Sequence, residues 1–190
     1  MKTLILIYDG YAEFEVNLVG LFMKGKGEVE MVADRETDFV TGTGNFRTVA
    51  HVQLSEVDPS EYDLLAIPGG DLSHLLDQQA VLNLIRAFHA QGKLIGAICA
   101  GPALLAAAGV LADSKFTTSF TKEEEPAANL FAWEHFTDED VTVAGNLVTA
   151  KGNAYVEFAV ALYEQLNLFE SEADKEETFD YFQNRQSCRM

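Results

Sequence analysis

Short apolar runs alternate along the chain with longer segments that have helical spacing. The runs are rich in Leu, Ile and Val and are apolar at nearly every position, as is typical of strands buried on both faces of a sheet. They cover residues 3–8, 28–33, 63–67 and 93–98. Two further runs, 141–144 and 147–149, flank Gly145 and Asn146, which predicts a β-hairpin. The alternation as a whole predicts an α/β fold, with a parallel sheet and helices on both faces.

The helical segments between these runs carry recognisable apolar faces and end signals. Residues 13–24 and 78–91 have apolar side chains at helical spacing. Residues 101–109 are rich in Ala and Leu and end at a glycine, a common helix terminator. A last core helix is predicted over 154–166, with Asn153 as the residue that caps its N-terminus.

The C-terminal segment differs from the rest in its charge. Residues 170–180 carry six carboxylates and one lysine. Phe179 and Phe182 are three residues apart and so lie on one face of a helix, where they could dock on the domain. We therefore expect one domain over residues 1–169, with 170–190 as its acidic, amphipathic helical extension. Disorder of this extension is the alternative.

Length and charge narrow the class of protein. A chain of 190 residues suits one compact domain. Its formal net charge of −17 repels phosphate backbones and anionic lipids, so we expect neither nucleic acid nor a membrane surface as a partner. The N-terminal apolar run meets an aspartate at once and does not resemble a signal peptide. Cys99 and Cys188 lie in very different settings and are not interpreted as a disulfide pair, so a reducing cytoplasm is the expected compartment.

Cys99 stands at the point where a buried strand is predicted to run into a helix. Within KLIGAICAGPALLAAAG, Ala97 lies two residues before it and Gly101 two residues after it. A nucleophile elbow needs small residues at those positions, because its sharp turn brings strand and helix close together. We expect the helix N-terminus to lower the pKa of the Cys99 thiol and to make it reactive. The alternative is a free cysteine that only packs in the core.

A Pro-Gly-Gly turn follows the predicted strand 63–67. The flexible backbone of Gly69 and Gly70 can approach a ligand closely. The N–H group of Gly70, together with that of Ala100, is a candidate for an oxyanion hole, and Gly69 is a candidate pocket residue. Taken alone, the Pro-Gly-Gly motif predicts only a turn.

Glu15 is the candidate acid–base group. It lies between Phe14 and Val16 in the segment after the first predicted strand, and burial among apolar side chains favours the protonated carboxyl. Such a group can exchange a proton with a thiol. An ordinary helix-start glutamate is the alternative. Because ligands of open α/β sheets bind outside the carboxyl ends of the strands, we expect Glu15, Gly70 and Cys99 to converge.

Over residues 2–166 the chain resembles the PfpI family, part of the class I glutamine-amidotransferase-like superfamily that includes the parkinsonism-associated protein deglycase. The matching motifs are Glu15, A-I-P-G-G at 66–70, A-I-C-A-G-P at 97–102 and T-A-K-G-N at 149–153. The resemblance implies a flavodoxin-like three-layer sandwich, a homodimer and a small-molecule substrate. It also implies that Cys99 is the nucleophile or an oxidation-sensitive thiol, that Glu15 hydrogen-bonds it, and that Gly70 and Ala100 donate to the oxyanion.

The chain departs from the family at its histidines. Protease-like members have His directly after the cysteine, where this chain has Ala100. Deglycase-like members have a pocket His after a Thr-Thr pair, where this chain has Ser119 followed by Phe120. None of the four histidines begins the His-x-Glu pair of glutamine amidotransferases. His135 and Phe120 remain candidate pocket residues, and Arg47, near a predicted hairpin, is a candidate to bind an anion at the pocket or the dimer edge.

These residues leave several functions open. The first is an enzyme of glyoxalase or deglycase type, in which Cys99 attacks a small reactive carbonyl and Glu15 moves protons, with no metal or organic cofactor. The second is a non-enzymatic redox or stress-response protein whose Cys99 oxidises to the sulfinate. The others are another small-molecule hydrolase or hydratase, and a ligand-binding dimer without a reaction. Protease and glutaminase activity are not expected, and Cys188 is interpreted as an incidental thiol.

Overall fold

The centre of the molecule is a six-stranded sheet with the strand order β2-β1-β5-β6-β8-β7. The computed structural model describes residues 1–125 and 127–183. The strands are β1 (Lys2–Ile7), β2 (Glu28–Ala33), β5 (Leu64–Ile67), β6 (Leu94–Ile98), β7 (Val141–Ala144) and β8 (Leu147–Ala150). All neighbouring strands are parallel except β7 and β8, which form the predicted antiparallel hairpin. The predicted, mostly parallel α/β sheet is therefore confirmed.

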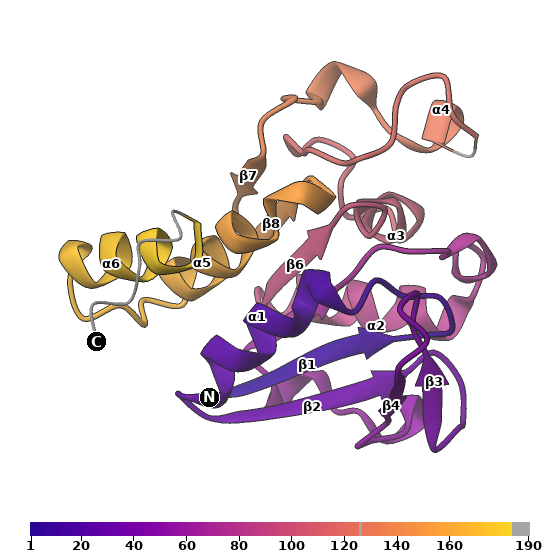
Figure 1. Cartoon of the computed structure of the whole chain (residues 1–190). Helices are drawn as coiled ribbons and strands as arrows, with labels where there is room; N and C mark the ends of the chain where they lie inside the picture. Colours follow the sequence, from indigo (N-terminus) through magenta and orange to yellow (C-terminus); the bar gives the residue numbers. More distant parts are fainter. Residues whose placement is uncertain (126, 184–190) are drawn as a thin grey trace.

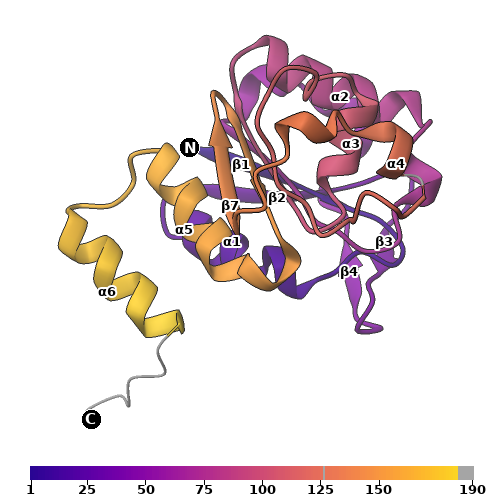
Figure 2. The same cartoon turned by 90° about the horizontal axis from the view of Figure 1, so that it is seen from above.

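Helices cover both faces of this sheet. Helices α1 (Phe14–Lys24) and α5 (Tyr155–Gln165) pack on one face, and α2 (Gln79–Ala90) and α3 (Pro102–Ala107) pack on the other. Figure 2 shows the sheet between these two layers, with the short helix α4 (Ala127–Leu130) on the α3 side. This is the three-layer, flavodoxin-like sandwich that the resemblance implied, and it buries β1, β5 and β6 almost completely.

Strand β2 corrects one of the sequence predictions. It lies at the edge of the sheet, so only its last two residues are fully buried, while Glu28 is exposed. Its glutamates fit this position at the edge. Glu30 forms an ion pair with Lys2 at 3.1 Å on the rim of the sheet. The prediction of burial on both faces was therefore wrong for this strand.

A separate two-stranded hairpin stands beside the start of α1. Its strands are β3 (Phe39–Thr41) and β4 (Arg47–Val49), which pair antiparallel. The Glu13 carboxylate holds the hairpin turn, accepting hydrogen bonds from the Thr43 hydroxyl at 2.9 Å and the Gly44 N–H at 3.0 Å. Glu13 thus ties the hairpin to the helix that carries Glu15.

The N-terminus of α5 is built differently from the prediction. A 3₁₀ turn over Gly152–Ala154 precedes the helix, and Ala154 occupies the cap position without a side-chain hydrogen bond. Asn153 lies inside this turn with its side chain exposed, so its predicted role as the cap was wrong. The chain begins to turn at Gly152, where the backbone passes directly against the Cys99 side chain.

The acidic extension forms helix α6 (Glu172–Gln183), which lies along α5 (Figure 1). Lys175 forms an ion pair with Glu164 of α5 at 2.5 Å, and the Phe182 ring packs against Phe22 of α1 with ring centroids 5.4 Å apart. The predicted helix is observed over Glu172–Gln183, where Phe182 contacts α1, and the division into a domain and its extension stays a prediction. Cys188 lies outside the described residues. Among the helices of the described ranges, none has the length and hydropathy needed to cross a membrane.

Candidate active site

Cys99 occupies a sharp turn between β6 and α3. Its φ of +62° lies in the left-handed region, which is unfavourable for a residue with a side chain. Hydrogen bonds fix this conformation: the Cys99 N–H donates to Ala150 O at 2.8 Å, and the Cys99 carbonyl accepts from the Thr118 hydroxyl at 2.7 Å and the Ser119 N–H at 3.0 Å. A strained backbone held by its surroundings is characteristic of functional sites. The predicted sharp turn between strand and helix is observed at Cys99, and its role as a nucleophile stays a prediction.

Glu15 reaches this turn from the first turn of α1. One carboxylate oxygen accepts a hydrogen bond from the Gly69 N–H at 2.6 Å, and the carboxyl also hydrogen-bonds the Cys99 side chain. The side chain is 2% exposed, and this burial raises the pKa of Glu15 above its ordinary value, although the bonds to Gly69 and Cys99 act in the opposite direction. The predicted raised pKa is therefore confirmed, and the carboxyl is placed to exchange a proton with the thiol.

The pKa of the Cys99 thiol is shifted in the direction opposite to the prediction. Burial, followed by the negative charge of Glu15, raises it to about 11. The Ser119 hydroxyl and the Ala100 N–H lower the pKa by smaller amounts. The expected helix effect is weak because α3 begins only at Pro102 and has six residues. The resting thiol is therefore protonated at neutral pH.

The Pro-Gly-Gly turn lies directly against the cysteine. The Gly69 N–H is used by Glu15, whereas the Gly70 N–H has no hydrogen-bond acceptor among the described residues. Gly70 has a φ of +115°, and a Cβ there would lie 2.2 Å from the Gly10 carbonyl oxygen, so only glycine fits. The Ala100 N–H hydrogen-bonds the thiol. Ala100 thus has its backbone donor at the sulfur, and the free Gly70 N–H follows the Gly69 residue that contacts Cys99. The role of both groups as an oxyanion hole stays a prediction.

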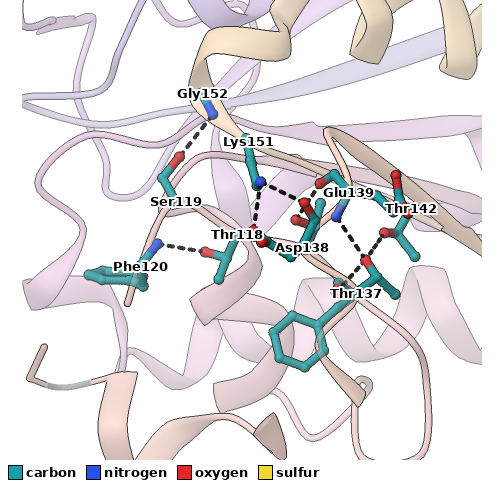
Figure 3. Close-up of polar contacts among 11 residues, drawn as sticks. Thr118, Ser119, Phe120, Thr137, Asp138, Glu139, Thr142, Lys151 and Gly152 are labelled. Carbon is teal, nitrogen blue, oxygen red and sulfur yellow. Dashed lines mark hydrogen bonds and ion pairs between the residues drawn. The ribbon is translucent and has the colours of Figure 1, made fainter. Parts of the chain in front are cut away.

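Two residues that the sequence did not single out complete this environment. The Ser119 hydroxyl hydrogen-bonds the Cys99 side chain and accepts a hydrogen bond from the Gly152 N–H at 2.9 Å, as Figure 3 shows. A Cβ on Gly152 would lie 2.9 Å from the Cys99 sulfur and 3.1 Å from a Glu15 carboxylate oxygen. Gly152 is part of the T-A-K-G-N motif and Ser119 follows a Thr-Thr pair, but neither pattern indicated contact with the thiol.

The remaining candidate residues, His135, Arg47 and Phe120, lie at different places relative to Cys99. No histidine among the described residues hydrogen-bonds Cys99, and the hydrogen bonds of His135 run through its backbone. Arg47 has its guanidinium over the Phe39 ring, 4.8 Å from the centroid, in the β3–β4 hairpin. Phe120 lines a cavity that Thr118 and Ser119 also line. Within residues 1–125 and 127–183 there is no cluster of three His, Cys, Asp or Glu side chains suited to hold a metal ion.

Known proteins resemble this chain in both sequence and fold. The model of the DJ-1/PfpI family matches residues 1–165. A deglycase of Thermococcus kodakarensis is 32% identical over 153 residues, covering 80% of this chain and 90% of the relative. A glutathione-independent glyoxalase of Caenorhabditis elegans is 30% identical over 156 residues, covering 81% and 82% of the two chains. A DJ-1 superfamily protein of Agrobacterium tumefaciens superposes with a TM-score of 0.81 at 28% identity, covering 96% and 97% of the two chains. The chain belongs to the DJ-1/PfpI family.

Proposed function

We propose that this protein converts small reactive carbonyls, as a glyoxalase- or deglycase-like enzyme that uses Cys99 and Glu15. The observation that carries the proposal is the hydrogen-bonded pair of the Cys99 thiol and the buried Glu15 carboxyl at a strained turn. The Gly70 N–H, next in the chain to Gly69, has no acceptor among the described residues and is the donor proposed for a developing negative charge. Relatives named deglycase and glutathione-independent glyoxalase support the same class of reaction.

The first step joins the thiol to the substrate. Glu15 takes the proton of Cys99, and the sulfur attacks the aldehyde carbon of a 2-oxoaldehyde. A carbon–sulfur bond forms while the electron pair of the C=O π bond moves to the oxygen, where the Gly70 and Ala100 N–H groups stabilise the charge. The proton then returns from Glu15 to this oxygen and gives a neutral hemithioacetal. The raised pKa of Glu15 suits it to hold a proton during this exchange.

The second step moves a hydrogen from C1 to C2 of the substrate. Glu15 removes the C1 proton, and an enediol forms as the C2 oxygen takes up a proton. Protonation of C2 and loss of the C1 hydroxyl proton then leave a thioester of the 2-hydroxy acid, so that C1 is oxidised and C2 is reduced. Water cleaves the thioester and regenerates the thiol. The sum is one 2-oxoaldehyde and one water giving one 2-hydroxy acid, without any external oxidant.

The redox alternative uses the same sulfur in a different way. Peroxide oxidises the thiolate, and a pKa of about 11 leaves little thiolate at neutral pH. Addition to an aldehyde has no such requirement, because Glu15 can take the proton while the carbon–sulfur bond forms. A solved relative, oxidized DJ-1 of Toxoplasma gondii, keeps the redox reading as the second candidate. Peptide or amide hydrolysis needs in addition an acid that protonates the leaving amine, and among the described residues no imidazole at Cys99 supplies it.

Turnover of methylglyoxal without glutathione tests the proposal. Lactate is followed by proton NMR in a Cys188→Ser background, so that only one thiol is present. We expect Cys99→Ala to abolish lactate formation and Glu15→Gln to lower kcat by about 100-fold or more, the usual contribution of a general acid–base group. Glu13→Gln makes the same charge change two residues away, and we expect it to preserve kcat. Lactate formation at an undiminished rate in Cys99→Ala would exclude the proposed chemistry.

A further inference from the structure

A cavity of about 520 Å³ opens beside the candidate active site. One side is formed by the segment Thr118–Lys122 and the opposite side by Asp138, Lys151 and Asn153. Trp133 and Phe136, from the aromatic loop before β7, complete the wall. Cavities of this size hold drug-sized ligands, and methylglyoxal would leave most of the space to water.

The cavity lies next to the surroundings of the thiol, although Cys99 itself is not among the residues that line it. Thr118 and Ser119 line it, and both hydrogen-bond Cys99. Lys151 and Asn153 line it from the other side, and they flank Gly152, whose backbone lies against the Cys99 sulfur. Figure 3 shows Ser119 joined to Gly152, with Lys151 beside them. Ser119 therefore contacts both the thiol and the cavity, which places the cavity next to a substrate bound at Cys99.

The wall of the cavity suits a flat, apolar substituent. Trp133 is fixed by a hydrogen bond from its indole N–H to Ala127 O at 3.1 Å and by edge-to-face contact with Phe136, with ring centroids 5.4 Å apart. Phe120 adds a third ring from the segment that contacts the thiol. Because these rings are held before a ligand arrives, stacking on them costs little conformational freedom.

The polar side of the cavity does not favour a charged substituent on the substrate. The Lys151 ammonium is held by Asp138, through the backbone oxygen at 2.6 Å and the carboxylate at 2.7 Å. The two charges compensate each other at the cavity rim (Figure 3). A neutral ring therefore fits both sides of the cavity better than an anionic chain does.

From this adjacency and the aromatic wall we infer that the cavity binds the ring of aryl-substituted 2-oxoaldehydes, with phenylglyoxal as the simplest example. The inference rests on the proposed function, since the reacting aldehyde is the one attacked by Cys99. Phe120 and Trp133 are the residues that select the ring. They act on binding and leave the chemistry at the thiol unchanged.

Two measurements test this inference separately from the proposed function. The first compares kcat/KM for phenylglyoxal and methylglyoxal in the Cys188→Ser protein, with the rate of Cys99→Ser subtracted to remove the known reaction of phenylglyoxal with arginine. We expect phenylglyoxal to be preferred, and Phe120→Ala to lower the ratio of kcat/KM for phenylglyoxal to that for methylglyoxal at least about fivefold. Phe39→Ala, an aromatic change outside the cavity, is the control. Equal losses for both substrates, or no preference in the parent protein, would overturn the inference.

The second measurement needs no turnover. Trp133 is the only tryptophan of the chain, so its fluorescence reports directly on this cavity. Acetophenone has the aryl ketone but no aldehyde, and we expect it to quench the fluorescence saturably, with the saturation lost in Phe120→Ala. Purely collisional, unsaturable quenching would overturn the inference. Saturable quenching without turnover of either substrate would refute the proposed function and leave the aryl-binding cavity standing.

Discussion

Replacing Glu15 by glutamine should make Cys99 more reactive toward an alkylating agent and at the same time less able to catalyse. The carboxylate contributes a like charge beside the sulfur and so raises the pKa of the Cys99 thiol. Glutamine has nearly the same shape, and its amide oxygen can still accept the bond from the Gly69 N–H. Its NH₂ group then faces the sulfur and can donate to a thiolate. The substitution removes a repulsion and keeps the geometry.

The structure limits how far Glu15→Gln can lower the pKa of the Cys99 thiol. All causes together raise the pKa of Cys99 from 9.0 to about 11, and burial is the largest of them. Loss of the Glu15 charge therefore recovers only part of that difference, and the alkylation midpoint of Glu15→Gln should lie below that of the parent protein but above the ordinary thiol value. Within this interval, a fall of about one pH unit raises the thiolate population at pH 8 about tenfold.

The assay is the rate of iodoacetamide alkylation as a function of pH, followed by intact mass in the Cys188→Ser background. Glu13→Gln is the matched control, because it removes a carboxylate from the same end of α1 without touching the sulfur. Its midpoint should equal that of the parent protein. A midpoint in Glu15→Gln that is unchanged or higher would refute the reasoning, since it would mean that Glu15 stabilises the thiolate as a protonated donor.

Three further outcomes follow from the same contacts. Ser119→Ala removes a hydroxyl that lowers the pKa of Cys99, so its alkylation midpoint should move upward, opposite to Glu15→Gln. Gly152→Ala places a methyl group 2.9 Å from the sulfur, and we expect alkylation to slow at least tenfold and thermal unfolding to show a loss of about 1–3 kcal/mol, as for other overpacked sites. Phe182→Ala should cost about 1 kcal/mol in urea unfolding, because the ring is half-buried, and should leave the alkylation rate unchanged.

The sheet could be predicted from the sequence wherever a strand is buried on both sides. Strands β1, β5 and β6 are apolar at nearly every residue, because neighbours on both faces exclude water. The hairpin β7–β8 was signalled by its Gly-Asn turn, where Gly145 has a φ of +61°. The prediction was wrong at β2 and at Asn153. Both errors have one cause, since a local pattern does not show whether an element lies at an edge or against another segment.

The candidate site also combines features that the sequence predicts with features that it does not predict. Small residues around Cys99 indicated the elbow, because the turn itself imposes them. The direction in which the thiol pKa is shifted could not be predicted in this way. The shift depends on burial by Gly152 and on the charge of Glu15, and both residues are distant from Cys99 in the sequence. Ser119 was not predicted for a related reason. A single hydroxyl in a loop has no periodicity, and only the fold brings it to the sulfur.

A high thiol pKa is an advantage for carbonyl addition when a base lies beside the sulfur. Intrinsic nucleophilicity rises with thiol pKa, so a thiolate formed at the moment of attack is stronger than one that is permanently ionised. In the proposed reaction Glu15 supplies the base, and Ser119 and the Ala100 N–H stabilise the sulfur as its charge develops. In the same proposal the resting thiol stays protonated and resists peroxide, which oxidises the thiolate. The raised pKa of the Cys99 thiol thus favours the carbonyl reaction over redox sensing. The pH dependence of alkylation tests this, because its midpoint should fall in Glu15→Gln and rise in Ser119→Ala.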